Sequence, residues 1–325
     1  MNALVLHTQR LSTEDGPGIR TTIFYKGCPL RCLWCHNPES ISPKVEVHWV
    51  ENRCIGCRMC VRACRRGALQ ENNGGLRIAR DICDACGCCA DVCPTNALEK
   101  LGQTIELDEL VSDLLKDRVY YQSSGGGVTA SGGEPTLQAA FTAALFERLR
   151  AEGVHTALDT CGMCSRSALE AIIHHSDLVL YDLKEMDELR HRHFIGGAPA
   201  VILENLRWVS AACAKKNIAL WVRTPLIPGA TARPENLSAI GAFLAGLPGP
   251  VARWELCAFN NLCRDKYRRL DIAWLYAHAP LLTQAELDEY ADVARASGID
   301  PRVVHATGAV SGSNSYPSES MYCTS

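Results

Sequence analysis

Three cysteines, Cys28, Cys32 and Cys35, follow one another on a C-x-x-x-C-x-x-C spacing within GCPLRCLWCHNPE, residues 27–39. Thiolates this close in sequence are suited to binding zinc or an iron-sulfur cluster, and a closed site of either kind usually takes four protein ligands. Around a cube with an iron at each corner, three thiolates leave one iron without a protein ligand. An open coordination position distinguishes a reactive metal site from a structural one. The spacing therefore predicts a reactive iron-sulfur cluster.

Two further cysteine runs follow, CIGCRMCVRAC and CDACGCCADVC, and each reads C-x-x-C-x-x-C-x-x-x-C. This is the run of bacterial ferredoxins, in which the fourth cysteine ligates the other cluster. Zinc ribbons instead separate two cysteine pairs by roughly 12 to 20 residues, so a contiguous run of four, present twice, disfavours zinc. The crossover predicts one cluster on Cys54, Cys57, Cys60 and Cys93, and a second on Cys83, Cys86, Cys89 and Cys64.

The composition limits the class of protein. The chain of 325 residues is 47% hydrophobic, which supports a sizeable globular core. A formal net charge of -3 argues against nucleic acid or an anionic membrane as the main partner. No apolar run approaches the roughly 18 residues that span a bilayer, and the N-terminus lacks the features of a signal peptide. The cysteines crowded between Cys28 and Cys93 are therefore expected to be metal ligands in a reducing cytoplasm rather than disulfides, apart from the surplus Cys88. The remaining ones are expected to be free thiols: Cys161, Cys164, Cys213, Cys257, Cys263 and Cys323.

The elements that must position these cysteines follow an α/β pattern. From about residue 108 onward, strand-like runs alternate with amphipathic helix-length segments, as in parallel βα units. Six strands are expected, at residues 21–27, 127–133, 155–160, 178–184, 218–229 and 253–259. Six such units predict a partial, TIM-like (β/α)6 barrel with its active site at the carboxyl ends of the strands. The expected domains are a discontinuous barrel (1–50 and 100–300), a ferredoxin-like two-cluster insert (51–99) and an irregular, poorly ordered C-terminal tail (301–325).

The loop of three cysteines resembles that of the radical S-adenosylmethionine (SAM) enzymes, whose C-x-x-x-C-x-aromatic-C motif follows the first barrel strand. Trp34 is the aromatic residue here. The resemblance narrows to the activating enzymes of glycyl radical enzymes and covers nearly the whole chain except the tail. It is carried by DGPGIRTTIFYKGCPLRCLWCHNPES, GGGVTASGGEPTLQ, LDTCG and LVLYDLK. The insert is similar to that of activases whose partners differ from the simple pyruvate formate-lyase, whose own activase lacks it.

The resemblance implies a reaction. SAM would bind the open iron through its amino and carboxylate groups, and an electron relayed through the insert would cleave it to methionine and a 5'-deoxyadenosyl radical. The radical would remove a hydrogen atom from a backbone glycine of the partner, and no side chain is expected to act as an acid or base. The implied cofactors are three [4Fe-4S] clusters, SAM and a monovalent cation. The implied partners are the glycyl loop of a glycyl radical enzyme and a flavodoxin or ferredoxin donor, with the chain itself monomeric.

The resemblance also assigns residues to SAM. Gly132, Gly133 and Glu134 of SGGEP are expected to hold its amino end, since glycines permit close approach and a carboxylate binds an ammonium group. Asp182 and Lys184, which strand alternation places on one face, are assigned to its ribose and carboxylate region. The other residues assigned to this site are Trp34, Asp159, Leu183, Asn260 and His36, for which packing beside the site is the alternative.

Several of these assignments leave an alternative open. Asp159 is expected to organise charge through the monovalent cation, and a purely structural role is equally well supported. Asn260 stands where simpler activases place a histidine near the adenosine, and its amide can hydrogen-bond but does not titrate near neutral pH. Asp15 and Arg20 are candidate contacts for the glycyl loop, with a tight turn before the strand as the alternative. The histidines without a motif, among them His191, are expected to be solvated.

Arginines surround the first ferredoxin run. Such a patch can dock an acidic electron carrier and steer its approach, and a solvated charged face is the equal alternative. The arginines concerned are Arg53, Arg58, Arg62, Arg65 and Arg66.

Two other classes of function remain open. An electron-transfer protein with three clusters would explain the insert but neither the three-thiolate loop nor GGEP. A radical SAM enzyme acting on a small molecule would account for both motifs. Formation of 5'-deoxyadenosine from SAM would distinguish an activase from an electron-transfer protein. A glycyl radical on a partner protein would distinguish an activase from an enzyme that acts on a small molecule. The sequence does not name the partner.

Overall fold

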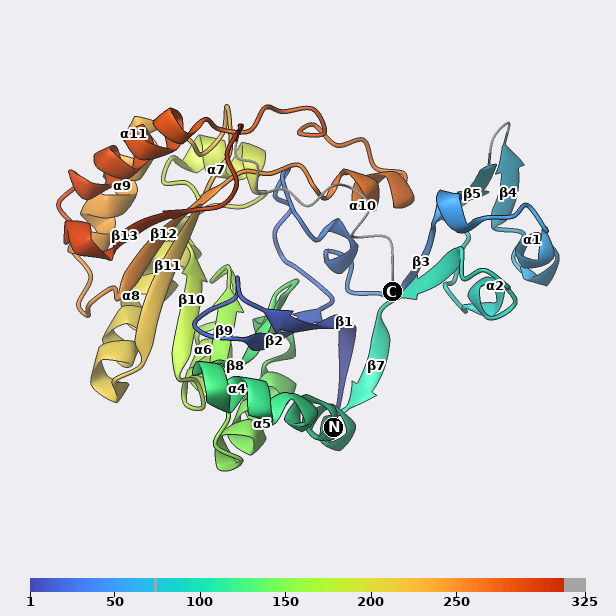
Figure 1. Ribbon diagram of the computed structural model, residues 1–325, viewed down its shortest axis with the longest axis horizontal. Helices are drawn as coiled ribbons and strands as arrows, with labels where there is room; N and C mark the ends of the chain where they lie inside the picture. Colours follow the sequence, from blue (N-terminus) through green and yellow to red (C-terminus); the bar gives the residue numbers. More distant parts are fainter. Residues whose placement is uncertain (73–74, 313–325) are drawn as a thin grey trace.

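The structure, a computed structural model, describes residues 1–72 and 75–312. Figure 1 shows a large, curved sheet flanked by helices, with a small lobe set to one side of it. The parallel strands of the large sheet are β2 (Arg20–Tyr25), β8 (Gly127–Gly132), β9 (His155–Thr160), β10 (Leu178–Asp182), β11 (Ala219–Leu226), β12 (Arg253–Ala258) and β13 (Val304–Thr307). The six predicted strands are all present, and the α/β class is confirmed.

Two strands at the N-terminal side of the sheet were not predicted. β1 (Asn2–Ser12) and β7 (Gln103–Glu106) extend the sheet by antiparallel pairing. Within the described residues the order is β13-β12-β11-β10-β9-β8-β2-β1-β7, so β13 and β7 are the edges and the barrel is open. β1 escapes a sequence pattern because polar residues such as His7 and Gln9 interrupt its apolar alternation.

The barrel also extends further toward the C-terminus than predicted. Residues 301–325 were expected to form an irregular tail, but β13 lies within them and pairs in parallel with β12 from Val304 to Thr307. A short, partly buried edge strand carries too few apolar residues to stand out in the sequence. The remainder of the predicted tail from residue 313 onward lies outside the described residues.

Helices cover the outer face of the sheet, and some of them lie below it in the view of Figure 1. The longer ones are α3 (Leu107–Leu114), α5 (Ala139–Ala151), α6 (Arg166–Ile173), α8 (Ala200–Lys216), α9 (Pro234–Ala245) and α11 (Gln284–Arg295), with shorter α4 (Arg118–Ser124), α7 (Glu188–Phe194) and α10 (Arg264–Arg269). Single 3-10 turns are η1 (Pro38–Ser40), η2 (Glu51–Arg53), η3 (Leu115–Asp117), η4 (Pro135–Gln138) and η5 (Pro301–Val303). None of the helices in the described part of the chain is long and apolar enough to cross a membrane.

Side-chain alternation along β11 shows how the core and the concave face are divided. Leu220, Val222 and Leu226 are fully buried in the core shared by the sheet and its helices. Arg223 and Pro225, which alternate with them, point to the opposite face and line the pocket described below. A strand with one apolar and one polar face therefore delivers charged groups to the interior of the open barrel.

The lobe beside the barrel spans more of the chain than the predicted insert. It begins with β3 (Glu46–Trp49) and ends with β6 (Leu98–Leu101), which pair antiparallel and form the connection to the barrel. The predicted boundaries of 51 and 99 therefore cut off part of this ribbon. Between its strands lie α1 (Met59–Ala63), the hairpin of β4 (Leu69–Asn72) and β5 (Gly75–Ile78), and α2 (Cys88–Asp91).

His191 was expected to be solvated, and the structure contradicts this. Its side chain on α7 is buried, and the ring Nδ1–H donates a hydrogen bond to the Gly197 carbonyl. Burial lowers the pKa of His191, because a charged ring would lose its hydration. The contact fixes the turn after α7, and this turn supports the loop of three cysteines.

Candidate active site

Backbone hydrogen bonds from three directions hold the loop that carries Cys28, Cys32 and Cys35. The Cys28 amide donates to the Ile41 carbonyl (3.1 Å), and the Arg31 and Leu33 amides donate to Ile195 and Phe194 at the end of α7 (2.8 and 2.9 Å). From the segment around α10, the Tyr267 hydroxyl and Trp274 indole donate to the carbonyls of Cys35 (2.8 Å) and Leu33 (3.0 Å). The loop is therefore fixed on both sides by side chains and turns distant in sequence.

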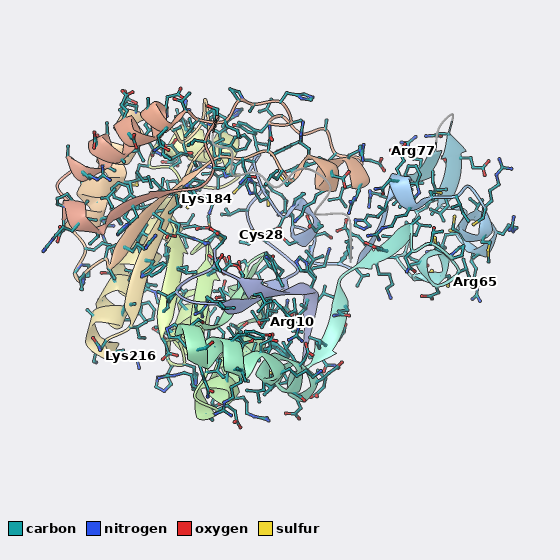
Figure 2. The ribbon with its side chains drawn as sticks, in the orientation of Figure 1. Arg10, Cys28, Arg65, Arg77, Lys184 and Lys216 are labelled. Atoms are coloured by element: carbon teal, nitrogen blue, oxygen red, sulfur yellow. The ribbon has the colours of Figure 1, made fainter. Side chains whose placement is uncertain are left out.

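The loop forms one wall of a pocket at the carboxyl ends of the strands. The pocket has a volume of about 450 Å³, within the range of small-molecule sites. Figure 2 shows Cys28 and Lys184 on the inner side of the curved sheet. The predicted site residues that line the pocket are Asp15, Cys28, Cys32, Trp34, Cys35, His36, Gly132, Gly133, Asp159, Asp182 and Lys184. The structure thus brings together residues from the loop and from β8, β9 and β10.

The donor set of the pocket suits a cluster better than a lone ion. Among the described residues, no three His, Cys, Asp or Glu side chains are arranged around a single metal ion. The thiolates of an iron-sulfur cube bind different irons and lie farther apart than the ligands of one ion. Three cysteines that face one pocket from one loop fit that requirement.

A network of four charged side chains lies opposite the loop. The Lys184 ammonium contacts Asp182 Oδ2 at 2.6 Å, and the Arg223 guanidinium contacts Asp182 Oδ1 at 3.3 Å and also pairs with Asp159. Asp159 accepts a further hydrogen bond from the Ser131 hydroxyl at 2.5 Å. Burial would raise the pKa of Asp182, but Lys184 and Arg223 together lower it, while burial raises the pKa of Asp159 to about 6. Two acids and two bases give the network no net charge.

Arg223 is the main residue of this network that sequence reasoning missed. It supplies a positive charge next to Asp159. The available signal was a charged residue within an otherwise apolar strand, WVRTPL. That signal could not identify its partners, because they lie on two neighbouring strands.

Gly132 and Gly133 line the pocket, and the structure gives a steric reason for both glycines. Gly132 has a φ of +99°, and a Cβ there would lie 2.5 Å from the Phe24 Cα. A Cβ at Gly133 would lie 2.1 Å from the Gly27 carbonyl oxygen. The glycines therefore let the end of β8 pack against the chain that enters the cysteine loop, in addition to leaving backbone exposed to a ligand.

Glu134 was expected to place its carboxylate on the amino group of SAM, and its position contradicts this. The side chain is fully buried and does not line the pocket. Its carboxylate accepts hydrogen bonds from the Thr136 and Thr160 hydroxyls at 2.7 and 2.8 Å and from the Cys161 amide at 2.8 Å. Glu134 thus joins the ends of β8 and β9 beneath the pocket.

Two other assigned residues occupy supporting positions. The Leu183 side chain is buried in the core and does not reach the pocket. The Asn260 carbonyl accepts a hydrogen bond of 3.1 Å from His36 Nε2, and its side chain accepts one from the Leu262 amide. Asn260 therefore orients His36, a pocket residue, without lining the pocket itself. Trp34 lines it while packing against Phe194 and Tyr276.

The two candidate contacts for a glycyl loop, Asp15 and Arg20, lie in different environments. Asp15 lines the pocket and accepts hydrogen bonds from Ser12 and Thr22 at 2.7 and 2.6 Å. Arg20 is fully buried, and its guanidinium donates to Thr129 Oγ1 and to the Val128 carbonyl at 2.6 and 2.8 Å. A partner peptide cannot reach a side chain that the protein encloses, so the assignment of Arg20 as a contact is wrong.

Replacing Arg20 tests its structural role. Arg20→Met is expected to lower the free energy of unfolding by about 1–3 kcal/mol, since the Val128 carbonyl and other buried acceptors lose their donor. Urea unfolding measures the change. Arg148→Met, which removes an exposed ion pair with Asp108, is the matched control and should change stability by no more than about 1 kcal/mol. Unchanged stability in Arg20→Met, with weaker partner activation, would favour the contact role instead.

The predicted ligands in the lobe gather around two small cavities. Their membership follows the ferredoxin crossover, because the fourth cysteine of each run lies with the first three of the other run. One cavity is lined by Cys54, Cys57, Cys60 and Cys93. The other is lined by Cys64, Cys83, Cys86 and Cys89, together with Cys88.

Comparisons with known proteins agree with this arrangement. Residues 22–237 match the model of the radical SAM superfamily. The chain belongs to the radical SAM superfamily. It is 38% identical to the isethionate sulfite-lyase activating enzyme of Oleidesulfovibrio alaskensis, over 82% of this chain and 87% of that protein. It is 37% identical to the benzylsuccinate synthase activating enzyme of Thauera aromatica, over 96% and 95% of the two chains.

A solved structure shows the same fold at low identity. The Streptococcus suis protein SuiB, bound to the precursor peptide SuiA, matches with a TM-score of 0.50 at 12% identity, over 86% of this chain and 46% of SuiB. The curated relatives narrow the family to the activating enzymes of glycyl radical enzymes. These enzymes generate a 5'-deoxyadenosyl radical from SAM and remove a hydrogen atom from a glycine of their partner, and the chain has this function.

Proposed function

We propose that this radical SAM activase uses three [4Fe-4S] clusters, one in the pocket and two in the lobe, and receives its electrons through the lobe. The observation that carries the proposal is the division of the lobe cysteines between two cavities in the crossover pattern. Four thiolates around each cavity match the ligand set of a ferredoxin cluster. The proposed domains are the barrel and a ferredoxin-like insert spanning residues 46–101.

The backbone of the insert repeats in the same way as its cysteines, which supports a duplicated cluster fold. The Ala68 and Ala97 amides donate to Cys64 Sγ at 3.3 Å and Cys93 Sγ at 3.2 Å, and each amide lies four residues after its cysteine. Hydrogen bonds to the sulfurs are one way in which proteins tune such clusters. Three pairs of equivalent residues adopt positive φ: Gly56 and Ala85, Arg58 and Gly87, and Gly67 and Asn96.

The pocket residues divide the work of holding SAM. Cys28, Cys32 and Cys35 would hold the cluster, which would leave one iron open to the amino and carboxylate groups of SAM and would supply the electron for reductive cleavage of its carbon-sulfur bond. The backbone at Gly132 and Gly133 would receive the amino end. Asp182 and Lys184 would bind the ribose and carboxylate region, with Arg223 and Asp159 fixing their orientation. Trp34 and His36 would line the remainder. The contribution of the chain is positioning and exclusion of water.

Charge in the insert favours one face for the electron donor. Residues 52–70 contain five arginines and no acidic residue, whereas residues 81–99 contain four acidic residues and no lysine or arginine. Arg53, Arg58 and Arg66 pair with acidic side chains. Arg62 and Arg65 remain exposed without an ion pair in the described residues, and Figure 2 shows Arg65 at the outer end of the lobe. We propose that they attract an acidic flavodoxin or ferredoxin in the cytoplasm.

Iron content tests the three clusters. The anaerobically reconstituted chain is expected to contain about twelve irons, four for each cluster. Cys60→Ala and Cys89→Ala each remove one ligand of a different cavity and should each lower the count by about four. A wild-type chain with only about four irons would overturn the proposal for the insert and leave the pocket cluster in place.

A panel of glycyl radical enzymes tests the partner. Relatives of similar identity are named for isethionate sulfite-lyase and benzylsuccinate synthase, so both belong in the panel with proteins encoded beside this chain. The reduced activase, SAM and each candidate are combined, and a glycyl radical is sought by electron paramagnetic resonance. A radical on one candidate identifies the partner. Formation of 5'-deoxyadenosine without a protein radical on any encoded neighbour would favour a small-molecule substrate.

A further inference from the structure

The insert is joined to the barrel by a narrow connection. Its two ends are β3 and β6, which form a two-stranded ribbon, and β6 is separated from β7 by Gly102. Gly102 has a φ of +105°, in the region that glycine adopts readily. Figure 1 shows the rest of the lobe lying beyond this ribbon. A ribbon with a glycine at its base does not by itself fix the angle between the two parts.

Arg80 makes a second connection, from the interior of the insert to the barrel. Its Nε and Nη2 donate to the carbonyls of Leu270 and Arg269 at 3.1 and 3.2 Å, at the end of α10. Its Nη1 donates to the Val47 carbonyl on β3 at 3.1 Å. One planar guanidinium therefore ties the ribbon, the insert and α10 together, and its fork of donors suits this geometry.

The same short helix contacts the loop of three cysteines. Tyr267 on α10 donates to the Cys35 carbonyl at 2.8 Å, and Lys266 binds Asn37 Oδ1 at 2.7 Å and Glu39 Oε1 at 2.8 Å. Tyr267 is buried and stacks on Trp274, with ring centroids 4.8 Å apart. In Figure 1, α10 lies on the side of the barrel that faces the lobe. The helix therefore has the cysteine loop along its side and Arg80 at its C-terminal end.

The two cavities of the insert differ in their position along the ribbon. Glu46, at the inner end of β3, is tied to the barrel by Lys26 Nζ at 3.0 Å. Its neighbour Val47 lines the cavity of Cys64, Cys83, Cys86 and Cys89. Trp49 and Leu98, at the far end of the ribbon, line the cavity of Cys54, Cys57, Cys60 and Cys93. The first is therefore the inner cavity, and Arg80 precedes its ligand Cys83 by three residues.

We propose that Arg80 is a positioning residue, which fixes the inner cavity of the insert against α10 and, through α10, relative to the Cys35 end of the pocket loop. The inference rests on the proposed function, because this geometry serves the reaction when both sites hold clusters. The flavodoxin or ferredoxin donor loses one electron, and SAM gains it as its carbon-sulfur bond breaks. Electron tunnelling falls steeply with distance, so a lobe that swings on Gly102 would slow this transfer.

Electron paramagnetic resonance of the dithionite-reduced full-length chain tests the positioning. The wild type is expected to show spin-spin coupling between the pocket cluster and the inner insert cluster. Arg80→Met should lose that coupling while keeping its iron content and the separate cluster signals. Arg80→Lys retains the positive charge but loses the planar set of guanidinium donors, so it should show only part of the wild-type coupling. Coupling of wild-type strength in Arg80→Met overturns the proposal.

Arg77→Met is the matched control. Arg77 lies on the same hairpin, is exposed, and has no ion pair or side-chain hydrogen bond in the described part of the chain. Figure 2 shows it on the hairpin at the top of the lobe. Its replacement should leave the coupling and the melting temperature unchanged, so that a general folding defect in Arg80→Met is detected.

Hydrogen-deuterium exchange gives a readout that does not depend on iron in the insert. Loss of the Arg80 contacts should reduce the protection of amides at the end of α10, including Leu270 and Ile272, which donate to the Tyr267 carbonyl. Arg77→Met should not. Unchanged protection in Arg80→Met overturns the inference whatever the iron count. A low wild-type iron count with lost protection instead refutes the insert clusters and retains the Arg80 contact.

Discussion

Cys32→Ala is expected to abolish the formation of 5'-deoxyadenosine from SAM and to remove about four irons per chain, the content of one cluster. Cys32 is the most informative of the three loop cysteines. The thiol of Cys161 lines the same pocket as Cys28, so it offers a replacement ligand in a Cys28 variant. A cluster reduced to two thiolates loses the coordination that holds it against the loop. Anaerobic iron analysis and chromatography of the SAM products measure the two losses.

Cys213→Ala provides the control for this experiment. Cys213 on α8 is buried in the main hydrophobic core and does not line the pocket. Its replacement removes a thiol of equal size while leaving the loop intact, so the iron content and SAM cleavage should match those of the wild type. Full iron content and normal SAM cleavage in Cys32→Ala would show that the loop does not hold the reactive cluster.

Arg223→Met is expected to lower the free energy of unfolding by about 3–5 kcal/mol, the range observed when one partner of a buried ion pair is removed. The side chains of Arg223 and Asp159 are only 16% and 10% exposed. Without the guanidinium, Asp159 keeps only the Ser131 hydroxyl, and Asp182 keeps only Lys184 as a charged partner. Urea unfolding under anaerobic conditions measures the change.

The double variant Arg223→Met with Asp159→Asn separates lost packing from an unpaired charge. It removes both members of the pair, so it should be more stable than Arg223→Met alone, as expected when a buried charge no longer lacks a partner. SAM binding, measured by calorimetry, should remain weaker than in the wild type because Asp182 has lost one of its two cationic partners. Additive destabilisation in the double variant would contradict the pairing of Asp159 with Arg223.

The parts of the site that depend on local spacing could be predicted from the sequence. Cys28, Cys32 and Cys35 belong to one loop, and their spacing alone indicates the ligand set. Asp182 and Lys184 lie two residues apart at the end of a strand, so alternation places them on the same face. The six parallel strands were recognisable for the same reason, because each is a short apolar run beside a helix-length segment.

The parts that depend on contacts between distant segments could not be predicted. Arg223 meets Asp159 and Asp182 only because β9, β10 and β11 are adjacent in the sheet. The Glu134 carboxylate accepts hydrogen bonds from β9 and from the residue after it. A sequence motif does not reveal these contacts. Nothing in the local sequence distinguishes the roles of Arg20 and Arg80. The core encloses Arg20, whereas Arg80 reaches from the insert to the end of α10.

The pairing of Glu46 with Leu101 bears on how a protein of this kind acquires or discards an entire module. The chain leaves the barrel along β3 and returns along β6, and because these strands are paired the two connections to the barrel lie next to each other. A short turn could replace all residues between Glu46 and Leu101 without changing the distance between the two points where the chain leaves and re-enters the barrel. The barrel can therefore keep the same catalytic scaffold whether or not the module is present.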